Sequence, residues 1–500
     1  MSPQIRRLAA VLMGAYALLF IQLNVVQIFR ADNYRVNPAN TRDFVRSFTE
    51  PRGSIRTADS EVIAETLVTE DDLERLRVYP HGELYSHVTG FLSLEFGATG
   101  LEQQYNSQLA GQDVEIRLQS LSDLFVDRDR TGQLELTIRH DLQLVARAAL
   151  GERNGSVVAL DPTTGAVLAM WSRPAYDPNL LSSHDISAVR TERFRLLEDP
   201  QNPLLARSYR ERFPPGSTFK IVTAAAGLDS GLVTQDAPTY PVTDEYIAPQ
   251  TERAIQNFGG SSCGGTLGEL LRVSCNTGFA EMAIQIGPQA MVEEAEAFGF
   301  NTPTPIDLPD PAASIMPSAD FFADNLPLLA QSGIGQFEVA ATPLQMAMIA
   351  STIANRGILM RPYVVERIVD ADGNVIDDPD TKVLGQPIGF TTAAQLQNLM
   401  LRVVDEGTAS SLRINGVLVG AKTGTAELPG REATHAWIIA FAPADNPLVA
   451  VAVLVEADDA LGQQTGGTVA GPIARAMIEA VLELPPSLES GQPGTESVQN

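Results

Sequence analysis

The chain begins with an apolar stretch long enough to cross a bilayer. Residues Leu8 to Phe29 form a run of 22 positions without a charged side chain. At about 1.5 Å per residue, a helix of this length spans a hydrocarbon layer of about 30 Å. A cleaved signal peptide has a shorter apolar core and small residues at its cleavage site. No such site follows Phe29, so the pattern predicts an uncleaved membrane anchor within residues 1–30.

Two groups of strand patterns lie far apart along the chain and enclose a long region of helical patterns. The early strands are expected at 134–138, 156–160 and 166–171, and the late ones at 417–425, 436–442 and 448–455. Amphipathic or capped helices are expected at 141–150, 343–355, 393–405 and 469–483. Strands at both ends of a helical insert predict an α/β chain of the α+β type, with one antiparallel sheet covered by helices.

These patterns divide the chain into four parts. After the anchor, residues 31–130 form a polar, arginine-containing region in which Pro51-Arg52-Gly53 marks a turn and Ser54 to Leu67 favour strands. The stretch from Phe96 to Gly111 is rich in turn-forming residues. No catalytic cluster appears in this region, which we interpret as a small mixed N-terminal domain. Residues 131–484 form the main domain, and 485–500, rich in Pro, Gly and Ser, are expected to be disordered.

Charge and composition narrow the function. The 500 residues include 61 acidic and 35 basic side chains, a net charge of −26, so we expect no nucleic-acid partner. Two cysteines exclude a disulfide-dense miniprotein. The five histidines show no zinc spacing, and we expect neither a metal nor a cofactor. Only three lysines occur, Lys220, Lys382 and Lys422. Arginine cannot replace a lysine that must lose its proton, so these three positions carry particular interest.

The first candidate motif is Ser217-Thr218-Phe219-Lys220, which precedes an apolar run from Phe219 to Leu228. A helix there places Lys220 one turn after Ser217 on the same face, where a neutral amine can accept the serine proton. Burial lowers the pKa of a lysine, as such a base requires. The alternative is a helix-capping serine followed by a lysine that reaches solvent.

Two further motifs are weak when taken separately. Ser274-Cys275-Asn276 follows the predicted helix 267–273 and offers a hydroxyl and a carboxamide, although an ordinary helix cap has the same composition. Lys422-Thr423-Gly424-Thr425 ends a predicted strand and offers a cation and two hydroxyls for a carboxylate. A turn at the edge of a sheet is the alternative for this tetrapeptide.

Together the three motifs occur in the order that penicillin-binding proteins and class A β-lactamases share. Their leading residues are separated by 57 and 148 positions, and two of the three lysines fall within them. The chain resembles the class B penicillin-binding proteins over nearly its whole length. The other segments that carry the resemblance are Pro51-Arg52-Gly53, Thr99 to Tyr105, Val158 to Pro162, Tyr176 to Asn179, Gly333 to Gln336 and His435-Ala436-Trp437.

The resemblance implies a membrane-anchored peptidoglycan D,D-transpeptidase that β-lactams inhibit. Ser217 would attack the carbonyl of a D-Ala-D-Ala bond and Lys220 would accept its proton. Ser274 would pass a proton to the leaving amine. The positive charge of Lys422 would maintain the electrostatic field around this serine.

Substrate-binding roles follow from the same resemblance. Asn276 would bind the substrate backbone, and Thr423, Gly424 and Thr425 would form the site for the terminal carboxylate. Stem peptides, β-lactams and a membrane glycan polymerase are the implied partners. The flanking arginines leave the orientation of the anchor open, and the chemistry places the main domain outside the membrane.

Several alternatives stay open from the sequence. A D,D-carboxypeptidase or β-lactamase-like hydrolase, and a non-catalytic β-lactam sensor or scaffold, share the motifs. Cys263 and Cys275 are compatible with a disulfide, although two free thiols are favoured. Gly260 to Gly264 matches a hydrolase GxSxG pattern without the leading strand that this motif needs. Neither a division or elongation role nor the diamino acid of the substrate can be read from the residues.

Overall fold

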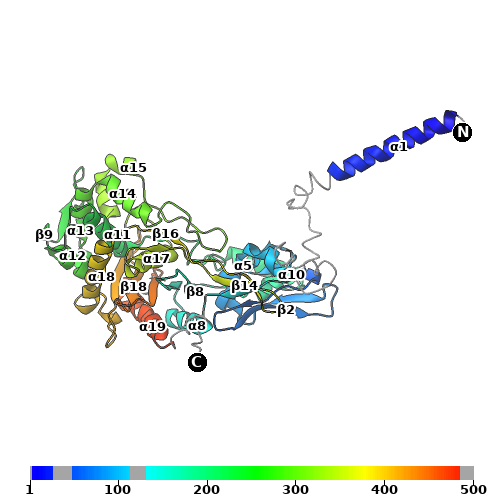
Figure 1. Cartoon of the computed structure of the whole chain (residues 1–500). Coiled ribbons are helices and arrows are strands. Elements are labelled where there is room, and N and C mark those ends of the chain that lie inside the picture. The colour runs from blue at the N-terminus through cyan, green and yellow to red at the C-terminus, as the bar shows by residue number, and fades with distance from the viewer. Residues whose placement is uncertain (1–2, 26–47, 113–130, 485–500) are drawn as a thin grey trace, which may run out of the picture.

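The computed structural model describes residues 3–25, 48–112 and 131–484. The N-terminal helix α1 spans Pro3–Asn24, so it begins five residues before the apolar run that starts at Leu8. Positions 26–29 of that run lie outside the described residues. Its window Pro3–Gln22 is long and apolar enough to cross a membrane, and none of it is buried against the rest of the described chain. Figure 1 shows α1 standing apart from the folded body.

A five-stranded antiparallel sheet forms the centre of the main body. Its order is β17-β18-β19-β7-β8, so the late strands pair with the early ones through β19 and β7. This arrangement confirms the predicted antiparallel sheet. The strands are β7 (Gly155–Leu160), β8 (Val167–Arg173), β17 (Gly420–Glu427), β18 (Thr434–Ala442) and β19 (Val449–Val455).

Helices cover both faces of this sheet. Every residue of β18, β19 and β7 is buried, which accounts for their nearly continuous apolar sequences. On one face, α8 (His140–Leu150) packs against α19 (Gly471–Leu482). On the other, α17 (Pro343–Ala354) is buried along its whole length, and Thr342 caps it by accepting a bond from the Gln345 amide. Both α17 and its cap agree with the prediction.

A mostly helical layer adjoins the β17 side of the sheet and supplies two of the three motifs. It contains α11 (Lys220–Asp229), α12 (Leu267–Val273), α13 (Asn276–Ile286), α14 (Pro288–Ala297) and α16 (Leu326–Ser332). The helix α18 (Phe390–Asp405) packs against both β17 and α12. The motif residues therefore converge where this layer meets β17.

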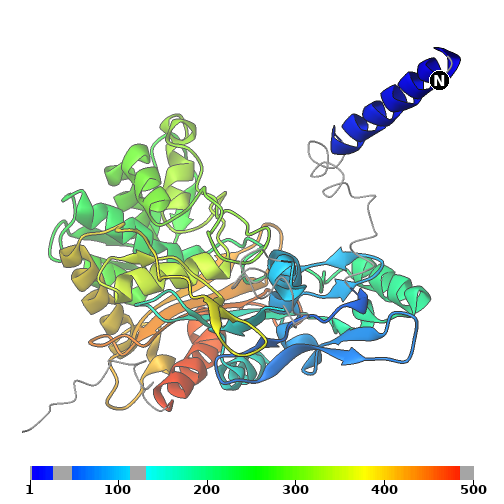
Figure 2. The same ribbon diagram turned by 45° about the vertical axis from the view of Figure 1, so that its right-hand side comes forward.

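The N-terminal region forms a second sheet that draws on distant parts of the chain. Its order is β15-β14-β6-β1-β2-β3, and β6 runs parallel to β1 but antiparallel to β14. Figure 2 shows the yellow hairpin of 365–377 beside the blue strands. Strands from both sides of position 130 share this sheet, where contiguous domains were predicted. The strands are β1 (Ile55–Arg56), β2 (Val62–Val68), β3 (Arg75–Val78), β6 (Gln133–Leu136), β14 (Val365–Val369) and β15 (Val375–Asp377).

A buried ionic cluster holds this second body together. Arg52 Nε and Arg77 Nε each lie 2.6 Å from a different carboxylate oxygen of Glu102, and all three side chains are buried. Burial alone would raise the pKa of Glu102, but the two guanidinium groups hold it below its usual value. The segment predicted as turn-rich instead contains two short helices, α5 (Gly100–Gln104) and α6 (Asn106–Leu109), the first of which carries Glu102.

Candidate active site

Ser217 lies in a single 3₁₀ turn, Gly216–Phe219, that leads directly into α11. The sequence predicted a helix from Phe219, so the turn that carries the serine is tighter than expected. Gly216 has φ +53°, and a Cβ there would approach the Thr425 carbonyl oxygen to 2.6 Å. The Trp437 indole donates to the Pro214 carbonyl at 2.9 Å. The turn is thus fixed against the sheet, with Ser217 at the edge of a cavity.

Lys220 begins α11 and is completely buried. Its Nζ donates to the Ser274 carbonyl and to Asn276 Oδ1, each at 2.7 Å, and lies 3.4 Å from Ser274 Oγ. Burial, reinforced by the nearby positive charge of Lys422, lowers the pKa of Lys220 well below its ordinary value. A neutral amine has two N–H groups for these two acceptors and keeps one lone pair for a proton.

Ser274 occupies the left-handed region, with φ 61° and ψ 43°, immediately after α12. A non-glycine residue there costs about 1–3 kcal/mol, and such strain is concentrated at functional sites. Lys422 Nζ donates to Ser274 Oγ at 2.8 Å and to the Thr423 carbonyl at 2.7 Å. Burial lowers the pKa of Lys422 to about 7. The hydroxyl of Ser274 therefore lies between two buried amines.

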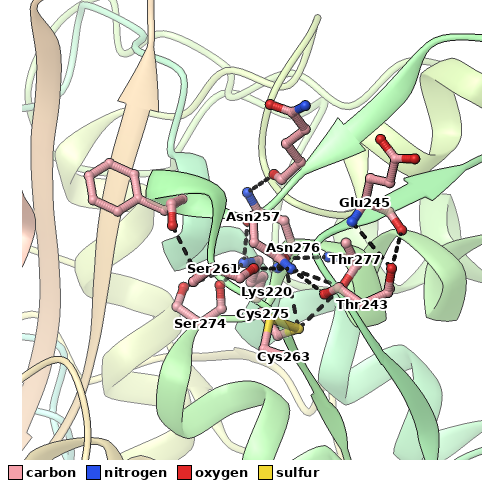
Figure 3. The surroundings of a disulfide bond; sticks show 12 residues. Lys220, Thr243, Glu245, Asn257, Ser261, Cys263, Ser274, Cys275, Asn276 and Thr277 are labelled. Atoms are coloured by element: carbon pink, nitrogen blue, oxygen red, sulfur yellow. Dashed lines mark hydrogen bonds between the residues drawn. A yellow bond between two sulfur atoms is a disulfide. The ribbon is translucent and has the colours of Figure 1, made fainter.

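Asn276 connects Lys220 to the neighbouring loop (Figure 3). Its Nδ2 donates to the Gln256 carbonyl at 2.9 Å, which leaves the second N–H of that amide for a ligand. The buried side chain of Asn257 accepts from the backbone amides of Asn276 and Thr277 at 2.9 and 3.0 Å. Asn257 therefore fixes the start of α13.

Cys263 and Cys275 form a disulfide, so the favoured interpretation of two free thiols was wrong. Cys275 stands between Ser274 and Asn276, and Cys263 lies in β12 (Cys263–Gly265). In Figure 3 the two sulfur atoms lie directly beneath the Asn276 side chain. The bond attaches the second motif covalently to the loop that carries Asn257.

The third motif runs along β17, where Thr423 and Thr425 line the cavity. A Cβ on Gly424 would come within 2.9 Å of the Pro215 carbonyl oxygen and of Thr218 Cγ2, so glycine permits the close approach of the Ser217 turn. Thr408 and Thr423 share a hydrogen bond of 2.6 Å between their hydroxyls. Thr408 also lines the cavity, although no sequence pattern indicated it.

All eight predicted site residues meet around one cavity of about 1010 Å³. Ser217, Ser274, Asn276, Thr423 and Thr425 line it, and the two lysines lie buried behind its wall.

The structure also tests the predictions for Lys382 and His435, which lie outside this set. Lys382 is exposed, in agreement with its interpretation as a solvated residue. The imidazole of His435 accepts from the Ala457 amide through Nδ1, which fits the expected structural role beside the strand. Its burial lowers its pKa to about 4, so the ring is neutral.

Comparison with known proteins places this geometry in a family. Residues 155–479 match the penicillin-binding protein transpeptidase domain, and residues 52–134 match the penicillin-binding protein A dimerisation domain. The chain belongs to the penicillin-binding protein transpeptidase family.

This penicillin-binding protein is 41 % identical to the peptidoglycan D,D-transpeptidase PbpA of Mycolicibacterium smegmatis, over 96 % of the chain and 99 % of the relative. It is 38 % identical to the peptidoglycan D,D-transpeptidase PbpA of Mycobacterium tuberculosis, with 97 % and 99 % covered. Its fold matches a solved ceftriaxone acyl-enzyme complex of M. tuberculosis penicillin-binding protein A with a TM-score of 0.81. That match has 36 % identity and covers 88 % of this chain and 100 % of the solved one.

Proposed function

We propose that the chain is a peptidoglycan D,D-transpeptidase that cross-links stem peptides through an acyl-enzyme on Ser217 and is inhibited by β-lactams. The convergence of Ser217, Lys220, Ser274 and Lys422 on one cavity carries the proposal. The names of the relatives and the β-lactam acyl-enzyme of the similar structure support it.

In the first half-reaction Ser217 Oγ attacks the carbonyl carbon of the penultimate D-Ala. Neutral Lys220 accepts the hydroxyl proton, because its lowered pKa keeps its lone pair available. The backbone N–H groups of Ser217 and Thr425 face the developing oxyanion, a large term in acyl transfer. Ser274 passes a proton to the nitrogen of the terminal D-Ala, which then departs.

Lys422 and the hydroxyls of Thr423 and Thr425 recognise the terminal carboxylate of the donor. The buried ammonium of Lys422 supplies positive charge, and the Thr408 hydroxyl orients Thr423. Gly424 allows the Ser217 turn to lie against this anion site. Asn276 has one N–H free to bind a carbonyl of the donor backbone.

In the second half-reaction an amine from another stem peptide attacks the acyl-enzyme. The proton that this amine loses passes through Ser274 and Lys220 to Ser217 Oγ. Ser217 then departs as a free hydroxyl, and the new amide is the cross-link. A D,D-carboxypeptidase or β-lactamase would use water at this step instead. A sensor or scaffold would bind β-lactams without turnover.

The likeness also supports a cellular setting. Helix α1 serves as a single-pass anchor, and the catalytic body lies outside the cytoplasm, where stem peptides are exposed. Residues 31–130 act as a pedestal for the transpeptidase domain of 131–484. The segment 485–500, which the sequence predicts to be disordered, lies outside the described residues. A membrane glycan polymerase is the proposed partner of the anchor and the pedestal.

Reaction products distinguish these functions. The full chain in detergent is incubated with uncross-linked glycan strands that carry pentapeptide stems, and the digested products are separated by mass. A transpeptidase yields cross-linked dimers with release of D-Ala, and both disappear with penicillin G or Ser217→Ala. Trimmed monomers without dimers indicate a carboxypeptidase, and unchanged stems indicate a sensor or scaffold.

A further inference from the structure

Glu427 is the one charged side chain among the described residues that line the active-site cavity. The other polar side chains that line the cavity are uncharged amides and hydroxyls, among them Gln256, Gln331, Gln336, Gln463 and Thr465. Of the two lysines buried behind the floor, Lys422, whose pKa is about 7, supplies the positive charge when it is protonated. The site therefore has a positive end at its floor and a single negative group at its mouth.

The carboxylate of Glu427 is available to a ligand. Glu427 is exposed, and within the described ranges no hydrogen bond or ion pair occupies its side chain. The nearest arginine along the chain, Arg431, pairs with Asp459 at 3.0 Å instead. Among the described residues, Glu427 thus supplies the one carboxylate that lines the cavity, and none of them is its counter-ion.

The position of Glu427 on β17 relates it to the anion site. Side chains alternate along a strand, so Thr423, Thr425 and Glu427 share one face, and all three line the cavity. Four residues of strand separate Thr423 from Glu427 by about 13 Å. Suppose that the terminal carboxylate of a donor peptide lies at Thr423 and Thr425 and that its backbone runs antiparallel to β17. The donor then extends along the strand toward Glu427.

The charge order of such a donor matches this arrangement. Two D-Ala residues cover about 7 Å in extended form. The side chain of the preceding residue, if it ends in an amine on a four-carbon stem, covers the remaining distance. We propose that Glu427 binds the side-chain ammonium of the diamino residue that precedes D-Ala-D-Ala in the donor stem peptide. The inference rests on the proposed function and names a specificity residue for it.

The test compares two donors that differ only in this charge. Nα-acetyl-L-Lys-D-Ala-D-lactate keeps the ε-ammonium, and its Nα,Nε-diacetyl analogue lacks it. The second-order rate of Ser217 acylation is measured for the full chain in detergent without an acceptor amine. An exposed ion pair predicts a preference of about three- to fivefold for the cationic donor. Glu427→Gln brings the ratio to about one, Glu427→Lys inverts it, and the matched exposed control Glu432→Gln keeps it.

A series of penicillins gives a second readout that needs no peptide donor. Ampicillin, penicillin G and carbenicillin carry an ammonium, a hydrogen and a carboxylate on the same side-chain carbon. Glu427→Gln should slow acylation by ampicillin relative to penicillin G and speed acylation by carbenicillin relative to it, each about three- to fivefold.

Unchanged ratios in Glu427→Gln with both series overturn the inference. An effect seen only when an acceptor amine attacks the acyl-enzyme overturns the assignment to the donor. A longer-lived acyl-enzyme with unchanged ratios would instead assign Glu427 to the activation of water. Failure of the proposed function is recognised separately. Either none of these compounds acylates Ser217, or the acylated chain forms no cross-linked dimers from pentapeptide strands, whatever the donor ratios are.

Discussion

Lys422 Nζ lies 2.8 Å from Ser274 Oγ, although the two residues are 148 positions apart in the sequence. The same hydroxyl is 3.4 Å from Lys220 Nζ, so it connects an amine on the helical layer with one on the sheet. Both amines are buried, and burial lowers the pKa of each. The Ser274 hydroxyl therefore joins the two buried amines, and in the proposed mechanism it would carry a proton from Lys220 to the leaving group.

Acylation should therefore depend on pH through both lysines. Lys220 must be neutral to accept a proton, so the rate rises as pH increases through its lowered pKa. Lys422, whose pKa is about 7, attracts the substrate carboxylate only when protonated, so the rate falls as pH rises through about 7. Stopped-flow acylation by penicillin G between pH 5 and 9 should give a maximum.

Lys422→Arg keeps the cation at all these pH values. This variant should be slower at its optimum and should lose the descending limb. A descending limb that persists unchanged in Lys422→Arg would assign it to another group.

The disulfide should stabilise both the fold and the second motif. It closes a loop with a sequence separation of 12, for which chain entropy predicts about 3 kcal/mol. The double variant Cys263→Ser/Cys275→Ser should lower the thermal midpoint and slow acylation, because Asn276 directly follows Cys275. Thermal unfolding and penicillin acylation measure the two effects. Acylation at the wild-type rate in the folded variant would show that the bond does not position the motif.

Glu102 should be essential to the stability of the N-terminal body. Glu102→Gln leaves two buried guanidinium groups without a counter-charge, which costs about 3–5 kcal/mol. Glu83→Gln, which breaks the half-exposed pair with Arg147, is the matched control and should cost no more than about 1 kcal/mol. Denaturant unfolding compares the two variants. Equal costs would contradict the role of the buried cluster.

Protonation of His435 should destabilise the fold below neutral pH. Its native pKa of about 4 lies below the unfolded value near 6.5, so the unfolded state binds the extra proton in this interval. The neutral ring contributes its full stabilisation above about pH 6.5. This contribution decreases as pH falls toward 4, and about 2 kcal/mol of it is lost at pH 5. Burial raises the pKa of Glu294 to about 8, so protonation of Glu294 stabilises the fold as pH falls. The pH dependence of the total free energy of unfolding therefore does not isolate the contribution of His435.

A comparison of the wild-type protein with a variant at position 435 isolates the contribution of His435. The cost of His435→Asn in free energy of unfolding should be about 2 kcal/mol smaller at pH 5 than at pH 7. A cost that does not change with pH would show that the native ring titrates near its ordinary value.

The sequence predicted the central sheet because its strands are buried on both faces. Residues 436–442 and 448–455 are almost entirely apolar, and few other structures accommodate such short runs. The site residues could be predicted from the sequence because of their composition and order, not because of a hydrophobic pattern. Lysine is rare in this chain, and Ser217, Ser274 and Lys422 keep the motif order even though their convergence depends on the fold.

Other features depend on contacts that no local pattern encodes. The parallel pairing of β1 with β6 places Ile55 opposite Leu134, 79 positions away, and the antiparallel pairing of β6 with β14 places Leu134 opposite Ile368, 234 positions away. Contiguous domains were therefore the natural prediction. Asn257 acts through hydrogen bonds from the amides of Asn276 and Thr277, and Thr408 acts through one bond to Thr423. Neither residue type stands out in its own segment. The cysteine spacing allowed both free thiols and the bond, because pairing depends on the loop geometry.

The most direct test of the account is the intact mass of the full chain after incubation with penicillin G. The wild-type protein should gain the mass of one intact penicillin molecule, bound covalently, and keep it over hours. Ser217→Ala should gain nothing while remaining folded. An adduct of the same mass on the Ser217→Ala protein would place the nucleophile elsewhere and contradict the site described here.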